Sequence, residues 1–192
     1  MGRELEWKYK ADPAQFASLL ADFSGLTETA METTYYDSPF RRLGILRWTL
    51  RRRMENGVSV CTLKTPAEDG SRNEWEVNCG NIMAAIPKLC QLGAPMELMA
   101  VSVSGVIPVC GARFTRKSRL MTLADCTLEL ALDQGILTGN GREQSLMEVE
   151  VEYKSGSEEA AVRFAAELAA KYGLETEAKS KFARAMALAA QP

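Results

Sequence analysis

The stretch Glu4-Leu5-Glu6-Trp7-Lys8-Tyr9, near the start of the 192-residue chain, alternates charged and apolar residues one by one. This period of two predicts a β-strand, because successive side chains of a strand point to opposite faces of a sheet. The three charged residues of the stretch would share one face, and its three apolar residues would share the other. We therefore expect a sheet with one charged face and one apolar face.

The same alternation recurs along the chain, in segments bounded by turn-forming pairs such as Asn56-Gly57. Helical segments lie between them and begin at capping residues such as Asp12 and Asn81. We expect an α+β fold with an antiparallel sheet, in a single domain that spans residues 1–192. Strands are predicted at residues 4–9, 27–36, 48–54, 58–64, 72–77, 113–123, 127–133 and 146–153, helices at 13–23, 82–92, 157–172 and 180–190, and turns at 133–135 and 139–141.

The composition excludes several classes of function. Lys and Arg total 23 against 25 Asp and Glu, and this net charge of −2 argues against a general nucleic-acid binder. The chain has no histidine, which excludes Ser-His-Asp and Cys-His catalytic systems and histidine-based zinc sites. Scattered cysteines without a Cys-x-x-Cys pair, and the absence of a signal-peptide or membrane-spanning stretch, favour a reduced cytoplasmic protein with no membrane partner.

Like charges cluster at alternate positions of the predicted strands. Side chains two residues apart start about 6.5–7 Å apart, and like charges so placed repel unless a ligand lies between them. Carboxylates at this spacing suit a hard divalent cation, and arginines suit a polyanion. The pattern favours a bound metal–polyphosphate, although a solvated sheet face is the ordinary alternative for each single strand. The clusters are Glu4/Glu6, Glu74/Glu76, Glu148/Glu150/Glu152 and Arg51/Arg53.

These residues belong to a series of motifs that resembles the CYTH family, also called triphosphate tunnel metalloenzymes. The N-terminal Glu-x-Glu-x-Lys strand of that family is matched by Glu4-Leu5-Glu6-Trp7-Lys8. One such motif alone would be weak, but the ordered series across almost the whole chain is specific. The further matches are Tyr35-Tyr36-Asp37-Ser38-Pro39, Leu50-Arg51-Arg52-Arg53, Thr62-Leu63-Lys64, Arg72-Asn73-Glu74-Trp75-Glu76, Leu130-Ala131-Leu132-Asp133-Gln134-Gly135, Glu148-Val149-Glu150 and Ser180-Lys181-Phe182-Ala183-Arg184-Ala185.

The resemblance implies a closed, eight-stranded antiparallel β-barrel, a triphosphate tunnel with the charged face inside and the helices packed outside. It also implies that carboxylates in the tunnel hold one or two Mg²⁺ or Mn²⁺ ions, while basic side chains hold the triphosphate. The implied catalytic residues are Glu4, Glu6 and Lys8. The implied metal ligands are Glu4, Glu6, Glu148 and Glu150, the substrate-binding residues are Lys8, Arg51, Arg53, Lys64, Arg116 and Arg184, and the supporting residues are Glu74, Glu76, Glu129, Asp133 and Lys181.

The activity that the resemblance implies is metal-dependent hydrolysis of a triphosphate by water. Inorganic triphosphate is expected to be preferred over nucleoside triphosphates, because no base or ribose pocket is evident in the sequence. Adenylate cyclase and thiamine triphosphatase are the alternatives within the family. Outside enzymes, the alternative is a polyphosphate- or nucleotide-binding module that has lost its metal site.

Two further points stay open at the level of sequence. The expected partner is a small-molecule triphosphate, and the sequence does not decide whether the chain forms a homodimer.

Trp48 follows an unusually basic stretch, residues 41–47, just before the strand that carries Arg51. Trp48 either packs in the core or stacks on a substrate ring, and core packing is the favoured interpretation.

Overall fold

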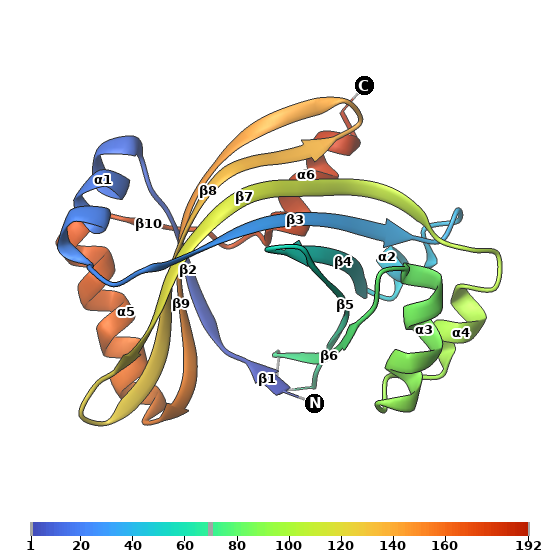
Figure 1. The fold of residues 1–192 in the computed structure, drawn as a ribbon, viewed down its shortest axis with the longest axis horizontal. Coiled ribbons are helices and arrows are strands. Elements are labelled where there is room, and N and C mark those ends of the chain that lie inside the picture. The colour runs from blue at the N-terminus through green and yellow to red at the C-terminus, as the bar shows by residue number, and fades with distance from the viewer. Residues whose placement is uncertain (1, 69–70, 192) are drawn as a thin grey trace.

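The computed structural model describes residues 2–68 and 71–191. Within these ranges, ten strands form one antiparallel sheet, and six helices pack around it (Figure 1). The strands are β1 (Gly2–Glu4), β2 (Glu6–Lys10), β3 (Thr27–Asp37), β4 (Thr49–Glu55), β5 (Val58–Pro66), β6 (Arg72–Asn78), β7 (Ile107–Thr122), β8 (Cys126–Gly139), β9 (Arg142–Gly156) and β10 (Glu175–Thr176). The helices are α1 (Pro13–Asp22), α2 (Arg42–Ile45), α3 (Ile82–Gln91), α4 (Glu97–Val101), α5 (Glu158–Tyr172) and α6 (Lys181–Ala189).

The sheet is strongly curved but open, which corrects the predicted closed eight-stranded barrel. Neighbouring strands follow the order β1-β6-β5-β4-β3-β7-β8-β9-β2-β10, so that among the described residues the order has two ends. The physical reason lies in the N-terminal segment, which is interrupted at Leu5. Its first part pairs with β6 only from Gly2 to Glu4, and its second part pairs with β9. The segment thus forms two short strands that lie near opposite ends of the sheet.

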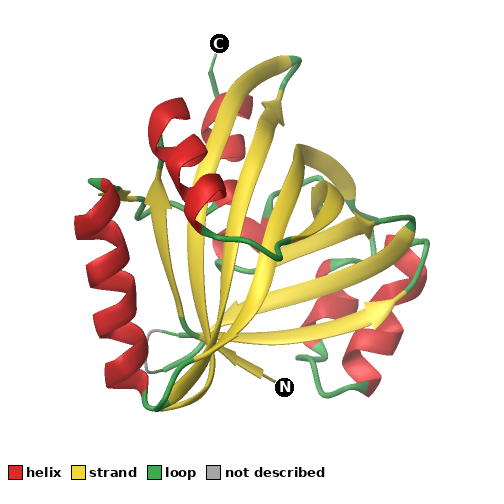
Figure 2. Ribbon diagram, turned by 60° about the vertical axis from the view of Figure 1, so that its left-hand side comes forward, coloured by secondary structure: helices red, strands yellow, loops and turns green. Residues whose placement is uncertain are grey.

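The apolar face of the sheet is covered by helices in two places, as predicted (Figure 2). At one side, α1 and α5 pack over β2, β8 and β9, where Leu130, Val149 and Val151 are fully buried. At the other side, α3 and α4 pack over β4, β5 and β6 around Leu63 and Leu89. Because burial of such side chains is the main stabilising contribution to folding, these two clusters fix the curvature of the sheet.

Helix α6 lies on the opposite face, which corrects the expectation that every helix packs outside the charged face. Its residues Ala185 and Leu188 pack with Leu137 of β8 and Leu146 of β9. Leu137 lies an even number of residues after Asp133 on β8, so both side chains point to the same face of the sheet. Helix α6 is therefore an apolar cover for one end of the face that carries the charges, rather than part of the outer layer.

The hairpin between β8 and β9 corrects one predicted turn and confirms another. The chain turns at Asn140-Gly141, where both residues have positive φ, 50° and 75°, as a tight two-residue hairpin requires. Residues 133–135, expected to form a turn, lie inside β8. Gly135 is needed there because a Cβ atom would lie only 2.1 Å from the carbonyl oxygen of Arg113 on β7. The glycine permits close strand approach and does not mark a chain reversal.

Helices α1, α3 and α5, all of which the sequence predicted, begin at capping residues. Asp12 accepts a hydrogen bond from the backbone N–H of Gln15 at 2.8 Å, and Asn81 and Ser157 make the corresponding bonds at the starts of α3 and α5. Helix α5 ends at Gly173 in the left-handed conformation. None of the described helices combines the length and the apolar character that a membrane crossing requires.

Candidate active site

The register of the sheet gathers the predicted charged residues on one side. Across β7, β8 and β9, Arg116 pairs with Asp133, and Asp133 pairs with Glu148. Across β2 and β9, Lys8 pairs with Glu150. We call this side of the sheet the charged face. Side chains from strands far apart in the sequence meet there because paired residues of adjacent strands point to the same face.

Three carboxylates come together at the centre of this face, and we call them the acidic cluster: Asp133, Glu148 and Glu150. All three are buried, and each offers an oxygen atom within 4.8 Å of the oxygens of the other two. Asp133 and Glu148 are register partners, and Glu150 follows two residues later on the same face of β9. The glutamates were expected here as metal ligands, and Asp133 was expected as a supporting residue.

Two arginines contact the acidic cluster from different elements. Arg116, on β7, donates from Nε and Nη2 to the two carboxylate oxygens of Asp133 at 2.8 and 2.7 Å, and its Nη2 also contacts Glu150. Such a bidentate contact fixes the guanidinium in one orientation. Arg184, on α6, contacts the other glutamate of the cluster, Glu148, through Nη2. Each arginine was expected to bind phosphate, and both are paired with acids here.

Lys181, at the start of α6, contacts all three carboxylates of the acidic cluster. Its Nζ lies 2.8 Å from Asp133 and 2.7 Å from Glu150, and it also contacts Glu148. With the two arginines, three cations therefore face three carboxylates, and the cluster is balanced in charge. This balance matters because a buried carboxylate without a partner would be strongly destabilising.

Burial and charge act in opposite directions on the protonation of the acidic cluster. Burial raises the pKa of Glu148 to about 7 against the opposing charge of Lys181, and the neighbouring Glu150 adds to the rise. Burial also raises the pKa of Glu150, but Lys181 and Arg116 outweigh it and hold this pKa well below the ordinary value. Burial lowers the pKa of Lys181, but the three carboxylates outweigh it and raise the pKa overall. Near neutral pH, the glutamate pair can therefore hold one proton beside a charged ammonium.

A second set of charges lies on β4, β5 and β6, and we call it the β4–β6 group: Arg51, Lys64, Glu74 and Glu76. Arg51 Nη2 lies 3.5 Å from Glu74 and 3.7 Å from Glu76, and Lys64 Nζ lies 3.4 Å from Glu74. Thr62 donates to Glu76 at 2.9 Å. Burial raises the pKa of Glu76, but Thr62 and Arg51 outweigh it and lower the pKa overall. The two acids, which were expected as supporting residues, contact the cations of this group.

The β4–β6 group and the acidic cluster belong to one charged interior. Burial lowers the pKa of Arg53, on β4, and the positive charges of Arg51 and Arg116 add to this effect. Burial raises the pKa of Tyr35, on β3, while the charges of Arg51 and Lys181 oppose the rise. Tyr35 is the register partner of Arg51 on β4, and its ring centroid lies 5.0 Å from that of Phe182, the neighbour of Lys181 on α6, so the two groups lie on one side of the sheet. Arg53 itself contacts Glu55 at the end of its own strand.

The N-terminal motif meets the acidic cluster through β2. Lys8 Nζ donates to Glu6 at 2.8 Å. Burial lowers the pKa of Lys8, but Glu6, Glu150 and Glu148 outweigh it and raise the pKa overall. The side chain of Glu4, expected to be a metal ligand, lies outside the described residues, and its backbone pairs with Arg72 of β6. The described part of the motif is thus adjacent to the acidic cluster.

Glu129, expected to support the site, is paired with Lys154, whose Nζ lies 3.1 Å from Glu129 and 2.8 Å from Glu152. Sequence reasoning missed Lys154, although its place two residues after Glu152 continues the charged alternation of β9. It also missed Glu177, a buried residue before α6 whose carboxylate lies 3.3 Å from Arg184. No periodic pattern surrounds Glu177, so no signal in the sequence could have found it.

Trp48 packs as the favoured interpretation expected. It is partly buried against the cluster that α3 and α4 form over β4–β6, which includes Leu50 and Leu89. Tyr36 and Val77 pack against the same cluster. The apolar side of the sheet therefore takes up the indole ring, and the structure supports a role in packing.

The acidic cluster fits a hard divalent cation by ligand type and spacing. Its donors are carboxylate oxygens alone, which suit Mg²⁺, Mn²⁺ or Ca²⁺ better than a metal that prefers nitrogen or sulfur. Glu6 is a further carboxylate beside it, held by Lys8. The ammonium of Lys181 contacts the same oxygens that a metal would use, so a bound metal would share or take over these contacts.

Comparisons with known proteins agree with this geometry. The sequence model of the CYTH domain family matches residues 2–186. The inorganic triphosphatase of Haemophilus influenzae is 29% identical over 164 residues, which make up 82% of this chain and 47% of that protein. The chain therefore spans about half the length of this curated relative.

Solved structures with the same fold come from a plant and a bacterium. A candidate adenylyl cyclase from Hippeastrum, described as having a dominant triphosphatase activity, has a TM-score of 0.71 at 19% identity and covers 98% of both chains. A candidate adenylate cyclase from Bacillus halodurans has a TM-score of 0.61 at 18% identity, over 94% of this chain and 96% of that chain. At these identities the likeness concerns the fold.

Proposed function

The chain belongs to the CYTH domain family, as its motifs predicted, and from this premise we propose that it is a metal-dependent triphosphatase. The reaction is attack of water on a phosphoanhydride bond of a triphosphate. Inorganic triphosphate is the proposed preferred substrate, with nucleoside triphosphates hydrolysed more slowly. The name of the Haemophilus influenzae relative, inorganic triphosphatase, supports this choice.

The observation that carries the proposal is the charged face, where a carboxylate cluster and several cations share one interior. A triphosphate carries several negative charges along a short chain, and arginine and lysine side chains bind phosphate oxygens well. In the proposed complex, Arg51, Arg53 and Lys64 bind the phosphate oxygens from one side. Arg116 and Lys8 bind them from the side of the acidic cluster. A solvated sheet face has no need of so many buried and partly buried ion pairs.

The proposed metal is Mg²⁺ or Mn²⁺, held by Glu6, Glu148 and Glu150, with Glu4 as the further ligand that the family motif implies. When bound, the metal would help to neutralise charge that develops on the phosphate oxygens. The residues of the chain have their own roles. Arg116 holds Asp133 and Glu150 in place, and Arg184 does the same for Glu148, so that the carboxylates are oriented before substrate arrives.

The test is release of phosphate from inorganic triphosphate by the purified protein with Mg²⁺, with Mn²⁺ and with EDTA. Glu6→Gln is the principal variant, because Glu6 is partly exposed and its loss is least harmful to folding. Glu143→Gln is the matched control, since Glu143 is an exposed acid on β9 that pairs with Arg113 at the surface. We expect metal-dependent release that Glu6→Gln lowers at least a hundredfold and Glu143→Gln leaves unchanged.

Several outcomes would contradict the proposal. Release that is equal with metal and with EDTA, or equal in both variants, would exclude the proposed site. Tight triphosphate binding without any turnover would favour the binding module. With ATP as substrate, cyclic AMP and pyrophosphate in place of free phosphate would identify a cyclase.

A further inference from the structure

A cavity of about 580 Å³ lies outside the acidic cluster, between the end of β2, the start of β9 and helix α6. We call it the α6 cavity. Its polar lining includes Lys10, Gln144, Lys179 and Arg184, all of which can donate hydrogen bonds, and one carboxylate, Glu177. Cationic side chains therefore outnumber carboxylates among the described residues of the lining, which is the composition of a site for an anion.

The one carboxylate that the described residues contribute to the α6 cavity is already engaged. Glu177 is buried, and one of its oxygens accepts the backbone N–H of Lys179 at 2.8 Å. Its other oxygen lies 3.3 Å from Arg184 Nη1 and 3.9 Å from Lys10 Nζ. Arg184 is balanced by Glu148 of the acidic cluster, so Glu177 is left with two lysines of the lining, Lys10 and Lys179, and one positive charge is in excess. An incoming anion would restore the balance.

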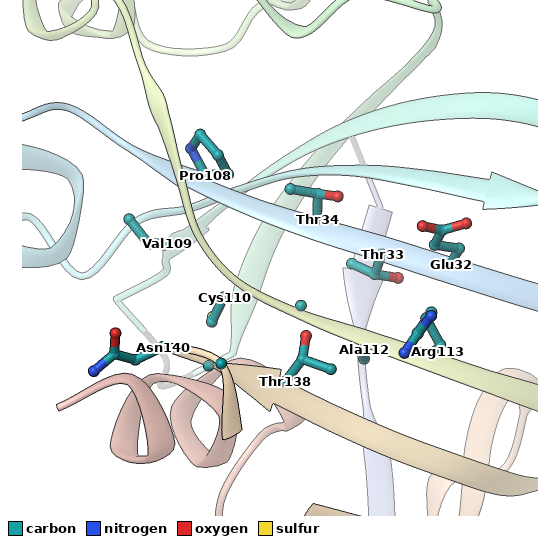
Figure 3. A pocket seen from close by; sticks show the side chains of 13 residues that line it. Glu32, Thr33, Thr34, Pro108, Val109, Cys110, Ala112, Arg113, Thr138 and Asn140 are labelled. Carbon is teal, nitrogen blue, oxygen red and sulfur yellow. The ribbon is translucent and has the colours of Figure 1, made fainter. Parts of the chain in front are cut away.

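Another cavity shows that this composition is particular to the α6 cavity. The cavity of about 360 Å³ over β3, β7 and β8 is lined by one acid, Glu32, and one base, Arg113, among threonines and small residues (Figure 3). Its charges are balanced without a ligand. The excess of cations is therefore a property of the residues around α6.

Arg184 connects the α6 cavity to the acidic cluster. Its Nη2 contacts Glu148 of the cluster, and its Nη1 contacts Glu177 of the cavity. One guanidinium therefore links the proposed reaction site with the cavity behind it.

We propose that the α6 cavity is a second anion site, which binds inorganic phosphate or pyrophosphate next to the charged interior. Lys10 and Lys179 bind the oxyanion from the solvent side, and Arg184 binds it from the side of the acidic cluster. The anion-binding property is independent of the proposed hydrolysis. Only the idea that the anion is a released product rests on the proposed function.

The test is calorimetric titration of pyrophosphate, and separately of orthophosphate, into the metal-free full chain. The principal variant carries Lys10→Gln and Lys179→Gln together. The matched control carries Lys117→Gln and Lys171→Gln, two lysines that pair with Glu28 and Asp22 on the surface. A third variant, Arg51→Gln with Arg53→Gln, removes the cations proposed for the interior site. Thermal unfolding of each variant verifies that it is folded.

We expect the principal variant to lower the affinity for pyrophosphate about tenfold or more, while the control changes it less than twofold. Binding to the α6 cavity should persist in the Arg51→Gln/Arg53→Gln variant. The proposal is overturned if the wild type does not bind either anion at millimolar concentration, if the principal variant binds like the wild type, or if the interior variant loses all binding. Failure of triphosphate hydrolysis, with this binding pattern intact, would contradict the proposed function and leave the anion site in place.

Discussion

Replacement of Lys181 by methionine tests the central feature of the site, the ammonium that contacts all three carboxylates of the acidic cluster. The Lys181 side chain is 11% exposed, and Asp133 and Glu148 are fully buried. Methionine keeps the length of the side chain but removes the charge, so the cluster would keep three acids and only two cations. Removal of one partner from a buried ion pair costs about 3–5 kcal/mol. We expect Lys181→Met to lower the free energy of unfolding by an amount in this range at pH 8.

Lys154→Met is the matched control, because Lys154 also bridges two carboxylates but does so in contact with solvent. Its side chain is 34% exposed, and its partners Glu129 and Glu152 are 26% and 31% exposed. Exposed ion pairs contribute about 0–1 kcal/mol, so this variant should lose no more than that. The free energy of unfolding is measured by urea denaturation, monitored by tryptophan fluorescence, at pH 8 and pH 6.

Two further measurements distinguish the loss of charge from the loss of packing in Lys181→Met. The loss of unfolding free energy caused by Lys181→Met should be smaller at pH 6 than at pH 8. At pH 6, the carboxylates that lack a cation take up protons. Added Mn²⁺ should stabilise Lys181→Met more than the wild type, because a divalent ion can replace the missing positive charge. A loss of unfolding free energy below about 1 kcal/mol in Lys181→Met would refute the reasoning. A loss that changes neither with pH nor with Mn²⁺ would also refute it.

Further predictions concern pH, thiol reactivity and packing. Burial raises the pKa of Glu148 to about 7 from an ordinary value of 4.5. Between these values, the folded protein holds a proton that the unfolded chain releases. The free energy of unfolding should therefore fall as the pH rises from about 5 to 7. Urea unfolding across this range should show the fall in the wild type and a smaller one in Glu148→Gln; a rise would contradict the assignment. Burial raises the pKa of Cys110 to about 12. At pH 8, iodoacetamide should therefore modify the partly exposed Cys79 and leave Cys110 unmodified until the protein unfolds. Peptide mass spectrometry can verify which thiol is modified. Gly135→Ala should lower the free energy of unfolding by about 1–3 kcal/mol or more, because the added Cβ meets the β7 backbone. Gly80 has open space around it, so Gly80→Ala should change the free energy of unfolding little. Equal effects of the two variants would contradict the close approach of β7 and β8.

The sequence carried enough information to place most of the charged residues on one face. Alternation with a period of two assigned Lys8, Glu148 and Glu150 to the same side as Arg51, because the direction of a side chain in a strand is a local property. Helix starts were equally local, since Asp12 caps the backbone of its own first turn. These features depend on residues a few positions apart, which is the range over which a pattern can be read.

The features that the sequence did not predict depend on contacts between distant segments. Closure of the sheet was wrongly expected, since the break at Leu5 depends on how two remote strands, β6 and β9, approach the N-terminal segment. The place of α6 was wrongly expected because its apolar residues do not specify which face of the sheet they cover. The pairing of Lys181 with three acids likewise depends on the three-dimensional arrangement of the chain. The sequence contains many acids and many cations, and it does not specify which of them pair with one another.

The division of the N-terminal segment between the two ends of the sheet has a consequence for how the protein folds. Leu5 accepts a hydrogen bond from Tyr153, and Glu6 pairs in register with Glu152 of β9, so β2 cannot pair with β9 until that distant strand has been synthesised. At about 5–20 residues per second, the delay on the ribosome is on the order of ten seconds. Pairing over such a sequence separation also slows folding in solution, because a long loop must close before the pair is formed. We therefore expect β2 to dock last, late in a slow folding reaction.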